Sequence, residues 1–258
     1  MSNRHVFAVL TSCVFATAAC GGGEAPKPAA APATAPAAAA PAAAAPAAGG
    51  GGSIAGKVSF EGAAPAAEKV KLSADPKCAA MHKDGLERQA IHVKDGGLGE
   101  ALVYVKSPVA GTYAPPSEPV LLDQKGCDYT PHMVVMQAGQ GLKIRNSDDT
   151  LHNIHPKPQQ NTEFNIGQPR QNMESTKNFD KAEVGIPVGC DVHPWMRAYI
   201  SVLSHPFFAV TKEDGSYEIK GLPAGEYEVE VFHGKAKGSS QKVTVKDGAA
   251  KLDFSLKG

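Results

Sequence analysis

The chain has 258 residues, with 26 Lys and Arg against 26 Asp and Glu, so its formal net charge at pH 7 is zero. Proteins that bind nucleic acid carry a surplus of basic side chains, so this balance argues against such a partner. Roughly 200 residues follow a low-complexity start, which is enough for one or two domains.

Residues 1–19 have the pattern of a secretory signal, because a basic start precedes a short apolar stretch, residues 6–16. The stretch is too short to cross a bilayer as a permanent helix. The small residues before Cys20 resemble a bacterial lipobox, although Thr17 stands where that motif has an aliphatic residue. We therefore expect export, lipidation of Cys20 and a position on the periplasmic side of a membrane; cleavage near Ala19 without lipid is the alternative.

The segment 20–52 consists almost wholly of Gly, Ala and Pro after its first residue. It has too little apolar side chain to offset the entropy lost on ordering. Repeated Pro also interrupts any helix that the alanines would form. The segment therefore predicts a semi-extended tether that holds a folded part away from the membrane.

The folded part shows no long stretch with helical periodicity. Short runs of alternating apolar and polar residues recur instead, and Gly, Pro, Asp and Asn separate them. This pattern predicts an all-β fold built as a sandwich or barrel. A short helix is expected at 76–83 or at 179–183. The alternating runs are 54–60, 101–106, 133–136, 142–145, 199–203, 217–220, 227–232, 242–246 and 251–256.

Three cysteines remain in the folded part, because Cys13 is removed with the signal and Cys20 carries the lipid. Paired thiols form disulfides in an oxidising compartment, so an odd count leaves one thiol free. We expect a Cys78–Cys127 disulfide and a Cys190 that binds a metal. The alternative, a disulfide that includes Cys190, would exclude the metal site described next.

A short loop sets three metal-binding side chains close together, Cys190, His193 and Met196, and His152 lies upstream. Two His, one Cys and a weak axial Met form the ligand set of a blue-copper electron-transfer site. Pro194 stiffens the loop between two predicted strands. Zinc would accept the two His and the Cys, but it gains little from the Met.

The order of these ligands resembles that of the cupredoxins, and most closely that of the amicyanins, over roughly residues 118–204. The shared loop is Cys-x-x-His-Pro-aromatic-Met-Arg, which begins here at Cys190, and Asn153 follows the upstream His as it does in that family. The resemblance implies a Greek-key β-sandwich that holds one copper ion through His152, Cys190, His193 and Met196.

The resemblance also implies roles for neighbouring residues. Asn153 would hydrogen-bond to the ligand loop and fix it. His193 would lie at the solvent edge and pass the electron, and Pro194 with Trp195 would form a docking patch for a redox partner. A buried core position is the alternative for Trp195. The partner of the amicyanins does not carry over, because this chain has long segments before and after the matched part.

The other histidines are weaker candidates. His155 would replace His152 as a ligand only if its strand bulges, because residues three apart point to opposite faces of a regular strand. His132 is expected to be structural, and His82, near Cys78, is a weak candidate for a second metal site.

The tail, residues 206–258, resembles carboxypeptidase regulatory-like (transthyretin-like) β-domains. It has their DG-x-Y…L-P-x-G-x-Y pattern, which begins at Asp214 and at Leu222. The first division that we consider is a copper domain over 53–205 followed by this small β-sandwich. In the alternative, 53–106 contributes strands to the tail domain and the copper domain is an insertion.

The sequence thus predicts a copper electron-transfer protein of the bacterial cell envelope, with envelope proteins as redox partners. It is not expected to be an enzyme, because no catalytic triad, paired-carboxylate motif or phosphate loop stands out. Two alternatives remain open: a copper carrier or storage protein, and a metal-free β-sandwich binding module.

Overall fold

The computed structural model describes residues 51–72, 75–246 and 248–258, which all belong to one compact unit. The predicted signal, Cys20 and nearly all of the tether lie outside these residues. Strands make up most of the described part, so the predicted all-β class is confirmed. No helix within these ranges is long and apolar enough to cross a membrane.

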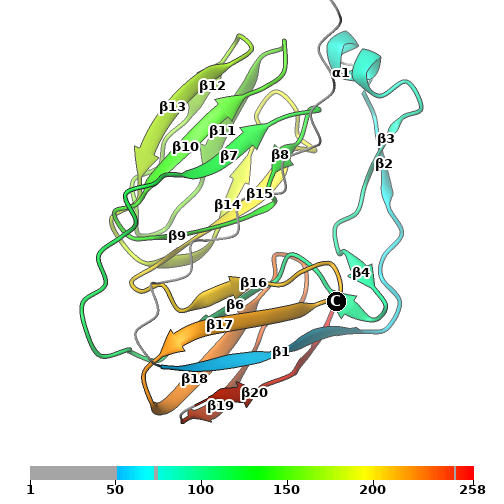
Figure 1. The fold of residues 1–258 in the computed structure, drawn as a ribbon. Coiled ribbons are helices and arrows are strands. Elements are labelled where there is room, and N and C mark those ends of the chain that lie inside the picture. The colour runs from blue at the N-terminus through cyan, green and yellow to red at the C-terminus, as the bar shows by residue number, and fades with distance from the viewer. Residues whose placement is uncertain (1–50, 73–74, 247) are drawn as a thin grey trace, which may run out of the picture. The chain divides into compact units, whose positions relative to one another are not determined.

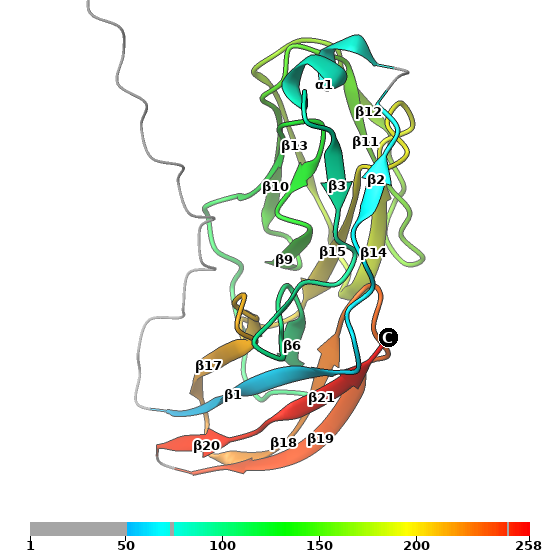
Figure 2. The ribbon, with the colours of Figure 1, turned by 90° about the vertical axis from the view of Figure 1, so that its right-hand side faces the viewer.

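One sandwich, here called the tail sandwich, combines strands from the front of the folded part with strands from its end (Figures 1 and 2). One sheet contains β1 (Gly52–Glu61), β4 (Val93–Lys94), β5 (Gly97–Leu98), β17 (Ser216–Leu222), β20 (Ala249–Lys251) and β21 (Phe254–Lys257). The other contains β6 (Leu102–Val105), β16 (Phe208–Val210), β18 (Gly225–Phe232) and β19 (Ser239–Val245).

Strand β1 connects the front of the folded part to the tail. It pairs antiparallel with β17 and parallel with β20 and β21, and β6 pairs antiparallel with β16 and β18. Strands β1, β4, β5 and β6 therefore share their sheets with strands of the tail, and the apolar side of β1 is buried in the same core. The division of the chain into domains stays a prediction.

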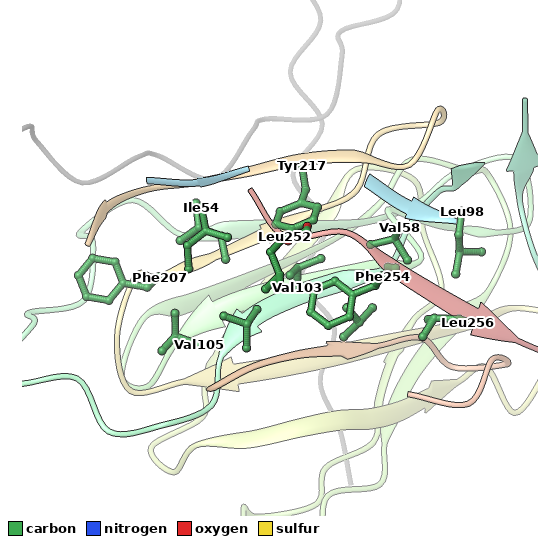
Figure 3. Close-up of a cluster of buried hydrophobic side chains, with 14 of the residues drawn as sticks. Ile54, Val58, Leu98, Val103, Val105, Phe207, Tyr217, Leu252, Phe254 and Leu256 are labelled. Atoms are coloured by element: carbon green, nitrogen blue, oxygen red, sulfur yellow. The ribbon is translucent and has the colours of Figure 1, made fainter. Parts of the chain in front are cut away.

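The core of the tail sandwich is apolar on both inner faces (Figure 3). Ile54 and Val58 of β1 point inward from one sheet, and Val103 and Val105 of β6 point inward from the other. Residues two apart share a face of a strand, so the alternation read from the sequence produces this interior directly.

The DG-x-Y pattern of the tail forms the tight turn before β17. The Asp214 carboxylate accepts a hydrogen bond from the Ser216 backbone N–H at 2.9 Å. Gly215 has φ 80°, and a Cβ there would lie 2.2 Å from the Val58 carbonyl oxygen, so only glycine fits. The Tyr217 hydroxyl donates to the Leu252 carbonyl at 2.6 Å. The pattern thus has a structural cause, while kinship with transthyretin-like domains stays a prediction.

The second sandwich, here called the ligand sandwich, lies in sequence between β6 and β16. Its β7–β10 and β9–β15 pairs are parallel, so the chain must cross over between the members of each pair. One sheet contains β7 (Val120–Gln124), β8 (Tyr129–Thr130), β10 (Gly141–Asn146) and β13 (Met173–Asn178). The other contains β9 (Met133–Gln137), β11 (His152–Pro156), β12 (Ile166–Gln168), β14 (Glu183–Gly189) and β15 (Arg197–Leu203).

A connecting arm joins β1 to β4. It consists of the paired strands β2 (Glu68–Val70) and β3 (Leu86–Arg88), with helix α1 (Pro76–Met81) between them. Asp75 caps α1 by accepting hydrogen bonds from two backbone N–H groups of its first turn. The helix expected at 76–83 is therefore present, whereas 179–183 is not helical and leads into β14.

Candidate metal centre

Three potential ligand atoms converge between two elements of the ligand sandwich. His152 begins β11, and Cys190 and His193 lie on the loop between β14 and β15. Their ligand atoms all lie within 4.8 Å of one another, and the three residues are 0%, 2% and 1% exposed. The His152 and His193 Nδ1 atoms are 2.9 Å apart, and the Cys190 Sγ is 3.8 Å from the His193 Nδ1.

The ligand loop is closed by its own backbone. The Met196 N–H donates to the His193 carbonyl at 2.9 Å, and the Cys190 N–H donates to the Met196 carbonyl at 3.3 Å. The His193 N–H points at the Cys190 Sγ, 3.4 Å away. Met196 is fully buried in the hydrophobic cluster that also contains Cys190. All three loop side chains therefore turn into the same end of the sandwich.

Cys190 is the one free cysteine of the described residues. Burial opposes its ionisation, but contacts with His152 and His193 and with backbone N–H groups outweigh this cost and lower the pKa of the thiol to about 6. The thiolate, which is the metal-binding form, thus predominates at neutral pH.

The His152 ring is held from its outer side by Asp148. The Nε2 atom lies 2.9 Å from the Asp148 Oδ2 atom. Asp148 is itself fixed, because it accepts hydrogen bonds from the Gly126 and Cys127 backbone N–H groups, each at 2.8 Å. Burial opposes protonation of His152, yet the Asp148 and Cys190 anions raise its pKa.

The His193 ring has an equivalent support from another part of the chain. Its Nε2 atom lies 2.9 Å from the Asp75 Oδ2 atom, and the disulfide sulfur of Cys78 is 3.7 Å away. The cap residue of α1 thus covers this ligand. The family resemblance implied a solvent-edged His193, and that expectation is wrong here, because the connecting arm lies over the ring.

These contacts determine which nitrogen faces the centre. An Nε2 atom that donates to a carboxylate carries the ring hydrogen, so a neutral ring presents a bare Nδ1 lone pair. Two such lone pairs 2.9 Å apart repel one another unless a proton or a cation lies between them. Two nitrogens bound to one ion at about 2.0 Å are about 3.3 Å apart at the tetrahedral angle. The residues present therefore fit a metal ion with His₂Cys ligation.

A disulfide connects the two supporting carboxylates. Cys78, on α1, is joined to Cys127, with Sγ atoms 1.99 Å apart. Cys78 donates its backbone N–H to Asp75, and Cys127 donates its own to Asp148. The structure has the predicted disulfide, which covalently links the segment that carries Asp75 to the backbone that holds Asp148.

Asn153 links β11 to the ligand loop. Its Oδ1 atom accepts the Asp191 N–H at 2.7 Å and lies 3.2 Å from the Cys190 Sγ. It therefore has the contacts that the sequence suggested for it. His155 is not part of the cluster: its ring contacts the Asp191 and Glu163 carboxylates at 3.1 and 2.7 Å.

Trp195 lies against the connecting arm. It is partly buried, its Nε1–H donates to the Cys127 carbonyl at 3.0 Å, and its ring centroid is 5.0 Å from that of His193. Pro194 is exposed. Trp195 therefore packs between the ligand ring and the arm, which is closer to a core role than to a projecting patch.

The two remaining candidates have separate environments. The His82 Nε2 atom lies 2.8 Å from the Gly126 carbonyl, so this ring is held by the backbone. His132 lies between the Asp128 and Glu100 carboxylates. Both ring nitrogens of His132 thus face a carboxylate.

Sequence reasoning missed Asp75 and Asp148. Asp148 had a signal, because it precedes His152 by four residues in a run of polar residues. Asp75 precedes Pro76 and so marks the start of a helix, but nothing local indicates that this helix would reach a ligand 118 residues away.

No family model and no curated protein matches the chain. Among solved structures, the copper-containing nitrite reductase NirK from Thermus scotoductus SA-01 is similar over 37% of this chain, with 21% identity and a TM-score of 0.32. This chain covers 25% of that reductase chain. A purple cupredoxin from Nitrosopumilus maritimus is similar over 32% of this chain and 97% of its own, with 18% identity and a TM-score of 0.28. A methionine-to-alanine mutant of amicyanin in its Cu(I) form is similar over 39% of this chain and 97% of its own, with 17% identity and a TM-score of 0.30.

Proposed function

We propose that this chain binds one copper ion through His152, Cys190, His193 and Met196, and that it transfers single electrons. The observation that supports this most is the pair of facing Nδ1 atoms beside a low-pKa thiol. Copper held by two imidazoles, a thiolate and a weak thioether supplies one-electron redox chemistry.

The surrounding residues keep the ligands in place. Asp148 and Asp75 aim the imidazoles, and Asn153 holds the loop at Cys190. Each of these side chains is hydrogen-bonded to backbone as well, so the ligand positions are set by the fold before any ion binds. Such a site changes little between oxidation states, which favours fast electron transfer.

The alternative of a copper carrier or storage protein predicts easy exchange of the ion. Full burial of the ligands and a disulfide-bonded arm over His193 favour retention instead. We expect a chelator of Cu(I) to remove copper slowly from the reduced protein, in which the ion is already Cu(I). Rapid removal, within the mixing time, would favour the carrier function.

The test is spectroscopic. Copper-loaded protein should show an intense visible thiolate-to-copper charge-transfer band and the paramagnetic resonance spectrum of a type 1 site. Cys190→Ser should abolish the band. His152→Gln should abolish or strongly shift it, whereas His155→Gln, a matched change three residues away on the same strand, should leave it unchanged. A loaded wild-type protein without the band would contradict the proposal.

We also propose that the protein is exported, is lipid-anchored at Cys20 and acts with redox proteins of the envelope rather than on a substrate. A disulfide in the folded part supports an oxidising compartment. The mass of the mature N-terminal peptide tests the anchor: a diacylated or triacylated Cys20 is expected, and an unmodified N-terminus would contradict it.

A further inference from the structure

A second cluster of metal-binding side chains lies outside the copper site. His92 and Glu100 flank the hairpin of β4 and β5, and the Gly99 N–H donates to the His92 carbonyl at 2.9 Å. His132 comes from the ligand sandwich, between β8 and β9. The three residues are partly buried, and their ligand atoms lie within 4.8 Å of one another.

The distances within this cluster suit one ion. The His132 Nδ1 is 3.3 Å from both Glu100 carboxylate oxygens, and the His92 Nε2 is 3.6 Å from the Glu100 Oε2. Ligand atoms bound at 2.0–2.2 Å to one tetrahedral ion are about 3.3–3.6 Å apart. The three side chains are therefore already close to a two-histidine, one-carboxylate arrangement.

His132 has the outer support that is typical of a metal-bound histidine. Its Nε2 atom lies 3.1 Å from the Asp128 Oδ2 atom, four residues before it in the chain. The same four-residue spacing joins Asp148 to His152 at the copper site. A carboxylate on the far nitrogen fixes the ring and directs the other nitrogen at the ion.

Two carboxylates, Glu100 and Asp128, face His132, and the Arg88 guanidinium lies 4.0 Å from the Asp128 Oδ1 atom. Burial opposes ionisation of Glu100, but its contact with His132 lowers the pKa of the carboxyl below its usual value, and Asp128 adds a second carboxylate nearby. Burial lowers the pKa of the neighbouring His233 to about 4, so that ring brings no positive charge.

We propose that His92, Glu100 and His132 bind a divalent cation of the zinc class, with Asp128 as the residue that positions His132. Two imidazoles and one carboxylate leave a fourth position of a tetrahedral ion for water. Glu100, His132 and His233 line a cavity of about 760 Å³, which gives that position space. The ion would join the tail sandwich, through His92 and Glu100, to the ligand sandwich, through His132.

The first experiment counts the ions. The mature, copper-loaded protein is dialysed against Zn²⁺, and metals are measured per chain. One zinc beyond the copper is expected, together with a higher midpoint of thermal unfolding. The proposed zinc site shares no ligand with the copper site, so a chain with His152→Gln, Cys190→Ser and His193→Gln together, which lacks three of the proposed copper ligands, should still bind one zinc. Failure of the copper proposal would therefore leave this test intact.

The second experiment locates the ion. Glu100→Gln and His92→Gln should each weaken zinc binding at least tenfold. Glu61→Gln is the matched control, because this exposed carboxylate pairs with Lys257 at the end of β1 and belongs to none of the candidate clusters of the described residues. Two outcomes overturn the proposal: no additional zinc in the wild type, or unchanged zinc binding in both variants. If zinc does not stabilise the wild type and the two variants nevertheless unfold more easily, the three side chains form a structural ion-pair network and not a metal site.

Discussion

The two sandwiches differ in what they bury. The main core of the tail sandwich consists of apolar side chains and tyrosines. The ligand sandwich also buries a set of polar side chains: Gln124, Asn146, Asp148, His152, Asn153, Gln168 and His193. Buried polar groups are costly unless they are hydrogen-bonded, and here they bond mainly to one another and to backbone. The two sandwiches thus differ in their interiors: the main tail core is apolar, and the ligand sandwich holds hydrogen-bonded polar side chains around the proposed copper site.

The largest expected effects test the two interiors. Leu222→Ala removes a fully buried side chain of the tail core and should cost about 2–5 kcal/mol of unfolding free energy. Leu142→Ala is the matched change in the ligand sandwich. Urea unfolding measures both losses. The visible band of folded, copper-loaded Leu222→Ala should be unchanged; a shifted band would show that the tail core affects the copper site.

Removal of the disulfide tests the connection to the connecting arm. Cys78→Ala with Cys127→Ala opens a loop with a sequence separation of 49 and should cost about 2–4 kcal/mol. It should also free α1 from its position over His193, so copper exchange with a chelator should become faster. Exchange at the wild-type rate would mean that the arm does not control access to the ion.

The supporting carboxylates are expected to have a smaller effect, and on the ion rather than on the fold. Asp148→Asn and Asp75→Asn should each lower copper affinity about 10–100-fold, because the ligand rings lose the group that aims them. Competition with a chelator measures this. Asp214→Asn, at an exposed turn of the tail sandwich, is the control and should have no effect on copper affinity.

The mildest test is the pH dependence of the metal-free protein. The pKa of Cys190 falls from 9.0 to about 6 on folding, so between these values the unfolded state binds more protons. The contribution of Cys190 ionisation to the free energy of unfolding is fully present above about pH 9 and is lost as the pH falls through about 6. Urea unfolding and ultraviolet thiolate absorbance should both report this, and Cys190→Ser should remove it. A thiol that titrates near 9 in the folded protein would contradict it.

The sequence predicted what depends on local spacing. Cys190, His193 and Met196 lie within seven residues, and a short loop can only place them together. The alternation in 54–60 and 227–232 likewise predicted strands, because residues two apart share a face.

It could not predict what depends on distant pairing. That β1 pairs with β17 rather than with the ligand sandwich depends on complementary apolar faces more than 150 residues apart. Coverage of His193 by Asp75 depends on where the connecting arm lies, which no local pattern reports. The expectation of an exposed ligand edge failed for that reason.

The position of β1 has a consequence for synthesis. Its partners β17, β20 and β21 leave the ribosome long after it, and about 155 residues separate the end of β1 from the start of β17, a delay of roughly 8–30 s at ordinary translation speed. During that interval β1 lacks the strands that pair with it along most of its length, although β5 and β6 are already made. The nascent chain must therefore be shielded by other means, and a release that comes too early leaves an open sheet edge that is prone to aggregate.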